Sequence, residues 1–404
     1  MKEITIREVK TYVTAPRGIN LVVVKVETSE PELSGYGCAT FTWRYKAVVT
    51  AIEEYLRPLL KGRSVQNIED LWQVMMGSSY WRNGAVLNNA ISGIDEALWD
   101  IKGKMANMPL YDLLGGKCRE GVAVYRHADG DSLEEMIELI HQYREEGLRY
   151  IRCQVGTYGG NRDGKFQSFV KPQNAPDGAY YHPRQYMRQA VEMMTQVRAT
   201  FGWELELMHD VHERLPLAET LQFAKEMEPF RLFFLEDSLP PDQVLYFKYL
   251  REQTSVPLAV GELFTHPLEW RTIVQNQWID FMRVHISAIG GLTPARKLAH
   301  FCELYGVRTA WHGPNDLSPI GAAAQIHLDS VSPNFGVQEI FAFTAEEQAV
   351  FPGCPVVKEG YAYLNEKSGI GVGFDEQEAG KFPAVEMEDR WLFSRLPDGT
   401  AVRP

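Results

Sequence analysis

Residues 232–262 have the sequence LFFLEDSLPPDQVLYFKYLREQTSVPLAVGE, and this stretch decides the fold. An apolar run that ends in an acid, LFFLED, is followed by a helical stretch at 240–252 and then by a second run of the same kind, PLAVGE. Short apolar strands that alternate with amphipathic helices are typical of a parallel β-sheet. The stretch therefore predicts two neighbouring parallel strands joined by a helix.

The same alternation continues on both sides of this unit. Five further runs have strand character: VAVY (122–125), YIRCQV (150–155), ELELMHD (204–210), DFMRVHI (280–286) and VRTAWH (307–312). Seven strands with nearly even spacing favour an α/β fold of the closed (β/α)8-type barrel over an open sheet. An open sheet usually carries a glycine-rich nucleotide turn, and GYGC at 35–38 does not match GxGxxG.

The remainder of the chain divides around this barrel. Residues up to about 40 alternate polar and apolar side chains like strands, and 43–115 have helical periodicity. We therefore predict an N-terminal α+β capping domain at 1–118, the barrel at 119–375, and a C-terminal segment at 376–404 that packs back on the cap. Residues 157–182 interrupt the rhythm after a barrel strand, and we interpret them as a lid.

Composition excludes several classes of function. The 404 residues include 41 Lys and Arg but 53 Asp and Glu, a net charge of −12, which argues against a nucleic-acid-binding surface. No apolar run approaches the ~20 residues that span a membrane, and the start lacks the apolar core of a signal peptide. The five cysteines form no CxxC pair, which favours a reducing compartment. We expect a cytoplasmic homo-oligomer.

Three acids end consecutive predicted strands. Asp210, Glu236 and Glu262 follow one another at intervals of 26 and 26 residues, about one strand–helix unit each. Because the carboxyl ends of barrel strands meet at one mouth, the three carboxylates would repel one another without a cation between them. Hard oxygen ligands suit Mg²⁺. Three separate acids that cap the following helices are the alternative.

Basic side chains accompany these acids. On an extended segment His212 faces the same way as Asp210, and it would serve as a general acid near neutral pH. Zinc binding by His209 and His212 is disfavoured, because residues three apart on a strand face opposite sides. Arg152, Arg283 and His312 also lie near strand ends, where the arginines suit the binding of a carboxylate.

These residues stand in motifs that resemble a known family. The chain is similar over nearly its whole length to the enolase superfamily, in its mandelate racemase/muconate lactonizing branch, and there to the mannonate dehydratase-like group of acid-sugar dehydratases. The motifs that carry the resemblance are ALWDIKGKMANMPLYDLLGG (97–116), HDVHER (209–214), FLED (234–237), GELF (261–264), DFMR with a later GG (280–291), WHGPNDLSP (311–319) and NFGVQE (334–339).

The resemblance implies a mechanism and a set of site residues. One Mg²⁺ per subunit would be held by Asp210, Glu236 and Glu262, and His212 would protonate the leaving hydroxyl of a sugar acid. The product would be a 2-keto-3-deoxy acid. Arg152 matches an arginine that is paired with a tyrosine base in that group. The residues implied to hold the substrate are His127, Arg283, His312, Asp316 and Glu339.

The chain departs from the family pattern in three places. His285 stands where racemases have the Asp of an Asp–His dyad, which disfavours racemisation. The tyrosine base of the mannonate-active pattern lies further along its loop, and Tyr158 is the nearest substitute here, with Tyr180 and Tyr181 as further candidates. Thr42 and Trp43 replace an Asn–Gly pair in the substrate-facing loop of the cap. D-Mannonate itself is therefore expected to be a poor substrate.

Two further functions stay open beside a Mg²⁺-dependent aldonate dehydratase. The first is a binding or regulatory protein that kept the metal site but lost turnover. The second is an acid-sugar epimerase, which would exchange the α-hydrogen without loss of water. A library of aldonic acids, assayed for a 2-keto product, distinguishes the three.

Overall fold

Eight parallel strands form the closed barrel that the strand–helix alternation predicts. The computed structural model describes residues 3–156, 169–387 and 392–403. The barrel strands are β4 (Val122–Gly130), β5 (Tyr150–Val155), β7 (Glu206–Asp210), β8 (Phe234–Glu236), β9 (Leu258–Val260), β10 (Phe281–Met282), β11 (Arg308–Thr309) and β12 (Gln338–Glu339). β12 pairs with β4, and a bridge from Thr309 to Phe335 joins its lead-in to β11, which closes the ring.

Helices cover the outside of the barrel, and a layer of side chains fills its interior. The outer elements are α6 (Leu133–Glu145), α7 (Pro183–Phe201), α8 (Leu217–Met227), η4 (Glu228–Phe230), η5 (Pro241–Tyr246), α9 (Phe247–Gln253), α10 (Pro267–Gln275), η6 (Ser287–Ile289), α11 (Leu292–Leu304) and α12 (Pro319–Val331). The barrel strands and their ends contribute one buried cluster, which comprises Tyr125, Met208, Phe234, Ala259, Phe281, Ala310 and Val337. The interior is therefore a packed core, and polar chemistry is confined to the strand ends.

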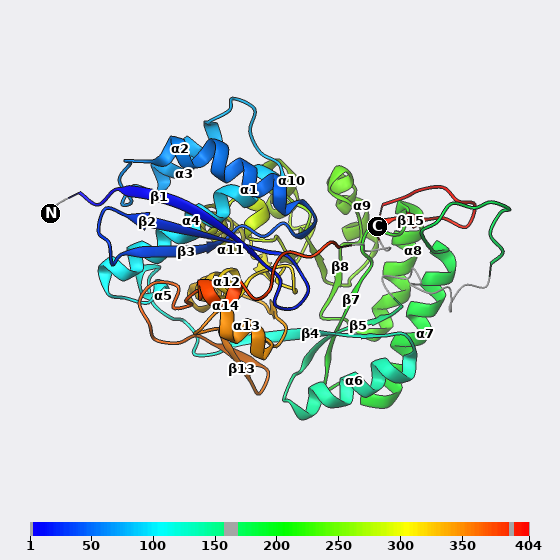
Figure 1. The fold of residues 1–404 in the computed structure, drawn as a ribbon. Helices are drawn as coiled ribbons and strands as arrows, with labels where there is room; N and C mark the ends of the chain where they lie inside the picture. Colours follow the sequence, from blue (N-terminus) through cyan, green and yellow to red (C-terminus); the bar gives the residue numbers. More distant parts are fainter. Residues whose placement is uncertain (1–2, 157–168, 388–391, 404) are drawn as a thin grey trace.

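The first part of the chain folds as a separate α+β unit beside the barrel. Its elements are β1 (Ile6–Thr14), β2 (Leu21–Thr28), β3 (Ser34–Cys38), η1 (Thr42–Arg44), α1 (Tyr45–Thr50), η2 (Ala51–Leu56), α2 (Arg57–Leu60), α3 (Ile68–Gly77), α4 (Ala85–Ala106) and α5 (Leu110–Leu113). Figure 1 shows this unit in blue, with its three antiparallel strands lying over α4.

The two glycines of the GYGC stretch in β3 are required for close packing against α4. A Cβ atom on Gly35 or Gly37 would collide with backbone carbonyls of α4, those of Ala97 and Gly93 respectively. Only glycine allows β3 to approach the helix this closely, so the motif serves packing. The helix then ends at Asn107, whose backbone is left-handed with φ 53°.

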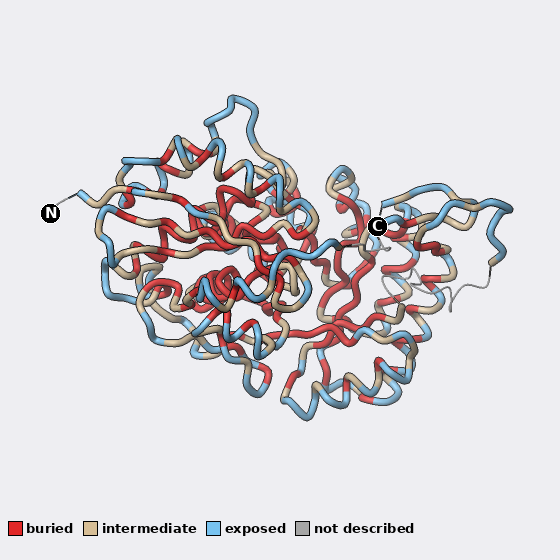
Figure 2. Tube along the Cα trace, viewed as in Figure 1, coloured by how far each residue is buried: buried red, intermediate tan, exposed pale blue. Residues whose placement is uncertain are grey.

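Buried polar contacts join the cap to the barrel. Asn88 of α4 donates to the carbonyls of Thr265 and Ala288 at 2.9 and 2.7 Å, and Asp95 accepts from the backbone and hydroxyl of Thr293 at 2.8 and 2.6 Å. Figure 2 shows that buried chain is continuous from the cap sheet into the barrel. The two units therefore share one core.

The C-terminal segment divides between two places. Residues after α13 (Ala345–Val350), β13 (Val356–Lys358) and β14 (Tyr361–Tyr363) return to the cap, where Phe382 and Val385, beyond α14 (Glu376–Ala379), bond to the turn that follows β1. The last strand, β15 (Ser394–Arg395), instead pairs with β6 (Ala179–Tyr180). The first half of 376–404 therefore contacts the cap, whereas the end of this segment pairs with β6.

The predicted lid falls partly within the described structure. Residues 157–168 lie outside the described residues, whereas 169–182 contain β6 and lead into α7. Among the helices of the part of the chain that the structure describes, none combines the length and apolar character that crossing a membrane requires.

Candidate active site at the barrel mouth

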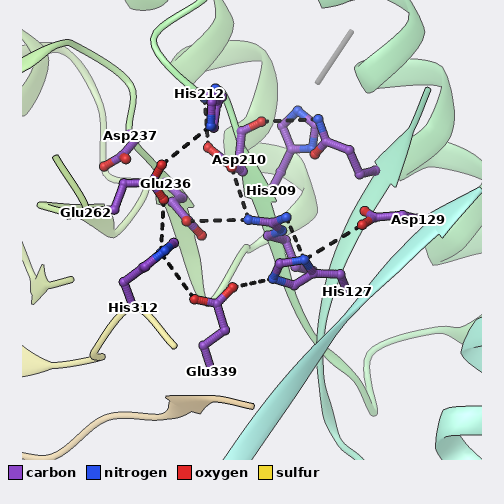
Figure 3. A network of polar contacts seen from close by, with 12 residues as sticks. His127, Asp129, His209, Asp210, His212, Glu236, Asp237, Glu262, His312 and Glu339 are labelled. Atoms are coloured by element: carbon purple, nitrogen blue, oxygen red, sulfur yellow. Dashed lines mark hydrogen bonds and ion pairs between the residues drawn. The ribbon is translucent and has the colours of Figure 1, made fainter. Parts of the chain in front are cut away.

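Three carboxylates meet where β7, β8 and β9 end (Figure 3). Asp210 and Glu236 close their strands and are paired in register, and both are completely buried. Glu262 lies two residues beyond β9, and Ala259 rather than Glu262 is the register partner of Glu236. The three acids are equally spaced in the sequence, but they do not lie at the same depth in the barrel mouth. The backbone turns at Gly261 with φ 138°, which brings Glu262 to the rim.

Two buried arginines contact these carboxylates. Arg152 Nη1 lies 3.0 Å from Asp210 Oδ2 and 3.5 Å from Glu236 Oε1. Arg283 Nη2 lies 2.5 Å from Glu236 Oε1 and 3.7 Å from Glu262 Oε2. Burial raises the pKa of Glu236 to about 7, against the opposing effect of Arg283. The two guanidinium groups thus compensate part of the negative charge that three neighbouring acids bring together.

The donors at this mouth fit a divalent metal of the Mg²⁺ type. Neither oxygen of Glu236 accepts a hydrogen bond from a described residue, although the side chain has no exposed surface. Its charge is met by the ion pairs with Arg283 and Arg152, and its oxygens keep lone pairs to which a metal ion would bind. Within residues 3–156, 169–387 and 392–403 no three His, Cys, Asp or Glu side chains form a ready ligand cluster, and the arginines contact the acids instead. The oxygen-only donor set favours Mg²⁺ over zinc.

His212 reaches the site by a different route from the one predicted. The strand ends at Asp210, and His212 has a left-handed backbone with φ 51°, so the extended-segment argument is wrong. The turn is held by Asp210 Oδ1, which accepts from the His212 backbone N–H at 2.7 Å. The imidazole nevertheless faces the carboxylates, with Nε2 3.4 Å from Glu262 Oε1. Burial opposes a charge here, but Asp210 and Glu262 raise the pKa of His212.

His209 turns away from the carboxylates and has a structural role. Its Nδ1–H donates to the Cys153 carbonyl at 2.9 Å, so Nε2 accepts from the Tyr186 hydroxyl at 2.7 Å. Burial lowers the pKa of His209 to about 4, and the ring is neutral. Tyr186 of α7 was not among the predicted residues, since nothing in the sequence marks it as a partner of β7.

The opposite wall is built around Glu339. This carboxylate is 1% exposed and accepts from Arg283 Nη2 at 3.1 Å, from the backbone N–H of Gly313 at 3.0 Å, and from His127 Nε2. Arg152 donates to His127 Nδ1 at 2.7 Å, which assigns the ring proton of His127 to Nε2. Glu339 therefore organises three donors of this wall.

A pair of histidines and Asp316 complete the cap-facing side. His312 Nδ1 lies 3.2 Å from Glu262 Oε2, and its Nε2 lies 3.7 Å from Asp316 Oδ1. His285 Nε2 is 4.0 Å from the same Asp316 oxygen. His285 Nδ1 accepts from the Ser287 backbone N–H, so it presents an N–H to Asp316. An aspartate–histidine dyad is thus replaced by two histidines that share one carboxylate.

The remaining predicted residues are Thr42, Trp43 and three tyrosines. Thr42 is buried and its hydroxyl donates to the Asn20 carbonyl at 3.4 Å, while Trp43 beside it is half-buried. Tyr158 lies outside the described residues. The Tyr180 and Tyr181 hydroxyls donate to the carbonyls of Pro176 and Arg214 at 2.7 and 3.2 Å. Neither of these two hydroxyls is therefore directed at Arg152 by the contacts it makes.

One aromatic residue of the site was missed in the sequence. The ring of Phe341 packs edge-on against His127 with centroids 4.9 Å apart. Phe341 stands two residues after Glu339, and such residues share a face on an extended segment. This spacing was the signal that could have identified it.

Comparison with known proteins agrees with the architecture. Residues 2–115 match the mandelate racemase / muconate lactonizing enzyme N-terminal domain, and 135–378 match the enolase C-terminal domain-like family. The chain is 73% identical over 404 residues to a D-galactonate dehydratase family member of Enterocloster bolteae and 51% identical over 405 residues to one of Enterococcus gallinarum, with all of both chains covered in each case.

A solved structure is similar over the same length. The crystal structure of an enolase from Pantoea ananatis with bound D-gluconate and Mg superposes with a TM-score of 0.97 at 48% identity, covering 99% of this chain and 100% of that one. The chain therefore belongs to the mandelate racemase/muconate lactonizing branch of the enolase superfamily, and within it to the D-galactonate dehydratase family.

Proposed function

We propose that this protein is a Mg²⁺-dependent dehydratase of a sugar acid of the aldonate class. The observation that carries the proposal is the barrel mouth itself, where three carboxylates, two buried arginines and His212 converge on one site. The Pantoea ananatis relative, which binds D-gluconate and Mg, supports both the cofactor and the class of substrate.

The metal would be held by the three strand-end carboxylates, Asp210, Glu236 and Glu262. Bound there, Mg²⁺ would supply positive charge for the substrate carboxylate and for the charge that develops when the α-proton leaves. The buried oxygens of Glu236, which form ion pairs with the arginines but accept no hydrogen bond from a described residue, are the part of the structure that supports this assignment most directly.

Two residues would carry the proton transfers, Tyr158 and His212. A base takes the α-proton, and we assign that role to Tyr158, because the Tyr180 and Tyr181 hydroxyls donate to backbone carbonyls. His212 gives its proton to the departing 3-hydroxyl, which leaves as water. The resulting enol takes up a proton at C3 and becomes a 2-keto-3-deoxy acid.

The remaining residues of the mouth would bind the sugar chain. Arg283 and His127 donate N–H groups to Glu339, His312 Nδ1 lies 3.4 Å from the same carboxylate, and Asp316 offers an acceptor. We assign the activity to the mannonate/gluconate type, with weak turnover of D-mannonate because Thr42 and Trp43 alter the cap loop. Replacement of the racemase aspartate by His285 disfavours an epimerase.

A screen of aldonic acids tests the proposal. D-Gluconate, D-galactonate, D-mannonate and their stereoisomers are incubated with the protein and Mg²⁺, and 2-keto products are detected with semicarbazide. We expect a product from at least one acid, and its loss in Glu236→Gln. If no acid in the library gives a 2-keto product although Mg²⁺ is bound, a binding protein would be favoured instead. Deuterium exchange at the α-carbon without loss of water would favour an epimerase.

A further inference from the structure

Arg17 joins the cap to two segments of the barrel mouth at once. It lies in the turn between β1 and β2, and its guanidinium donates to Asn315 Oδ1, to the Ala342 carbonyl and to Glu347 Oε2. The Glu347 contact measures 2.5 Å, and the two side chains are only 19% and 5% exposed. We call these four residues, Arg17, Asn315, Ala342 and Glu347, the Arg17 latch.

The acceptors of the latch are neighbours of site residues. Asn315 directly precedes Asp316, which contacts His312 and His285. Ala342 directly follows Phe341, whose ring packs on His127, and lies three residues after Glu339. Each acceptor is thus one to three residues away from a side chain of the mouth, so a shift of the acceptor would also move that side chain.

The latch is itself firmly supported on both sides. On the cap, the C-terminal segment holds the turn: Phe382 O accepts from the Ala15 backbone N–H at 2.9 Å, and Val385 O accepts from Asn20 Nδ2 at 2.9 Å. On the barrel, Glu347 also accepts from the Thr344 backbone N–H at 2.8 Å, which closes the capping box of α13.

The surroundings of the guanidinium strengthen its contacts. A small pocket beside it is lined by Pro314, Leu317, Phe341 and Phe343 together with Arg17 and Glu347. Ion pairs in such partly apolar surroundings are stronger than exposed ones. The two terminal nitrogens of Arg17 reach acceptors on separate segments, whereas a lysine has a single terminal nitrogen.

We propose that Arg17 is a positioning residue that sets the spacing between the 313–317 loop and the 339–342 segment, and so shapes the part of the site that receives the sugar chain. This inference rests on the proposed function for the identity of the ligand. It does not involve the metal ligands, because none of Asp210, Glu236 and Glu262 contacts a member of the latch among the interactions described above.

Hydrogen exchange measures the ordering of the two segments without any substrate. In Arg17→Met we expect backbone exchange in peptides covering 311–319 and 338–344 to be about tenfold faster. Arg17→Lys should behave like Arg17→Met, because it keeps the charge but loses the fork. Asn315→Leu should affect 311–319 and spare 338–344, and it keeps the test decisive if Arg17→Met does not fold. Arg7→Gln, which removes an exposed ion pair with Glu27 on the same sheet, is the matched control.

Calorimetry of binding then tells whether Arg17 positions the two segments for the sugar acid or only stabilises the protein as a whole. In Arg17→Met we expect the Kd of D-gluconate, measured in the presence of Mg²⁺, to rise about tenfold or more, while the Kd of Mg²⁺ alone stays unchanged. Unchanged exchange in both segments, or equal weakening of both ligands, would overturn the proposal. If the native protein binds neither D-gluconate nor D-galactonate, the proposed function fails, and the exchange result still decides whether the latch orders the mouth.

Discussion

Arg283 Nη2 lies 2.5 Å from Glu236 Oε1, and both side chains are completely buried. The same guanidinium also contacts Glu262 and Glu339, so one cation touches three acids of this mouth. Taking either member of such a pair away leaves an uncompensated charge in a place where water cannot reach it.

Replacement of Arg283 by methionine should therefore destabilise the metal-free protein. We expect a loss of about 3–5 kcal/mol in the free energy of unfolding, measured by urea denaturation in EDTA. Mg²⁺ should restore part of the loss by binding the uncompensated charge of Glu236. The double variant with Glu236→Gln should lose less than the two single losses combined. Arg7→Gln is the control, with an effect within about 0.5 kcal/mol, and equal stability of Arg283→Met and native protein would contradict the account.

His212→Asn should separate the two halves of the reaction. Without the acid, loss of water should slow by about 10²–10⁴-fold, whereas exchange of the substrate α-hydrogen with D₂O should persist, because the base is untouched. Proton NMR follows both processes in one sample. Full dehydration by the variant would remove His212 from the role of acid.

The two tyrosines Tyr158 and Tyr181 give a matched pair for the base. Tyr158→Phe should abolish both α-hydrogen exchange and dehydration. Tyr181→Phe should retain most turnover, because its hydroxyl donates to the Arg214 carbonyl and not to the substrate. Equal turnover of Tyr158→Phe and native protein would show that another group takes the proton.

Much of this arrangement could be predicted from the chain alone. The periodicity of apolar residues located seven barrel strands, and β5 has the predicted bounds of 150–155. The eighth strand, β12, was missed as a strand because its two paired residues, Gln338 and Glu339, are both polar, so no apolar run marks it. Strand ends, where the site lies, depend on tertiary contacts that a pattern of hydrophobic residues does not encode.

For the site, the identity of the residues could be predicted from the sequence, but their orientation could not. The identities of the three acids and two arginines were accessible, because charged residues at the ends of apolar strands need a reason to be there. The orientation of His212 was not, because it depends on a left-handed residue held by Asp210. The Arg17 latch joins residues about 300 positions apart, and nothing local in the sequence marks such a contact.

Two buried acids of α4, Asp95 and Glu96, give a prediction for pH. Burial raises the pKa of Glu96 to about 8 and that of Asp95 to about 7. Because the folded protein holds these protons more tightly than the unfolded chain, their contribution is complete at pH values below about 4.5, the usual range of a carboxyl, and is lost as the pH rises towards 8.

Urea unfolding between pH 5 and 9 measures this effect. In Glu96→Gln the free energy of unfolding should fall less steeply with rising pH, by up to about 1.4 kcal/mol per pH unit. Glu204→Gln, at an exposed position, should leave this slope unchanged. Identical pH profiles for native protein and Glu96→Gln would show that Glu96 does not titrate in this range.

The central claim is that the three strand-end carboxylates hold Mg²⁺ for the dehydration of a sugar acid. The most direct measurement is NMR in D₂O of the acid that turns over best in the aldonate library, with native protein in Mg²⁺ and in EDTA. The account predicts a 2-keto-3-deoxy acid with one deuterium at C3, formed only with Mg²⁺. Formation of that product in EDTA at the same rate, or α-hydrogen exchange in Mg²⁺ without any loss of water, would contradict it.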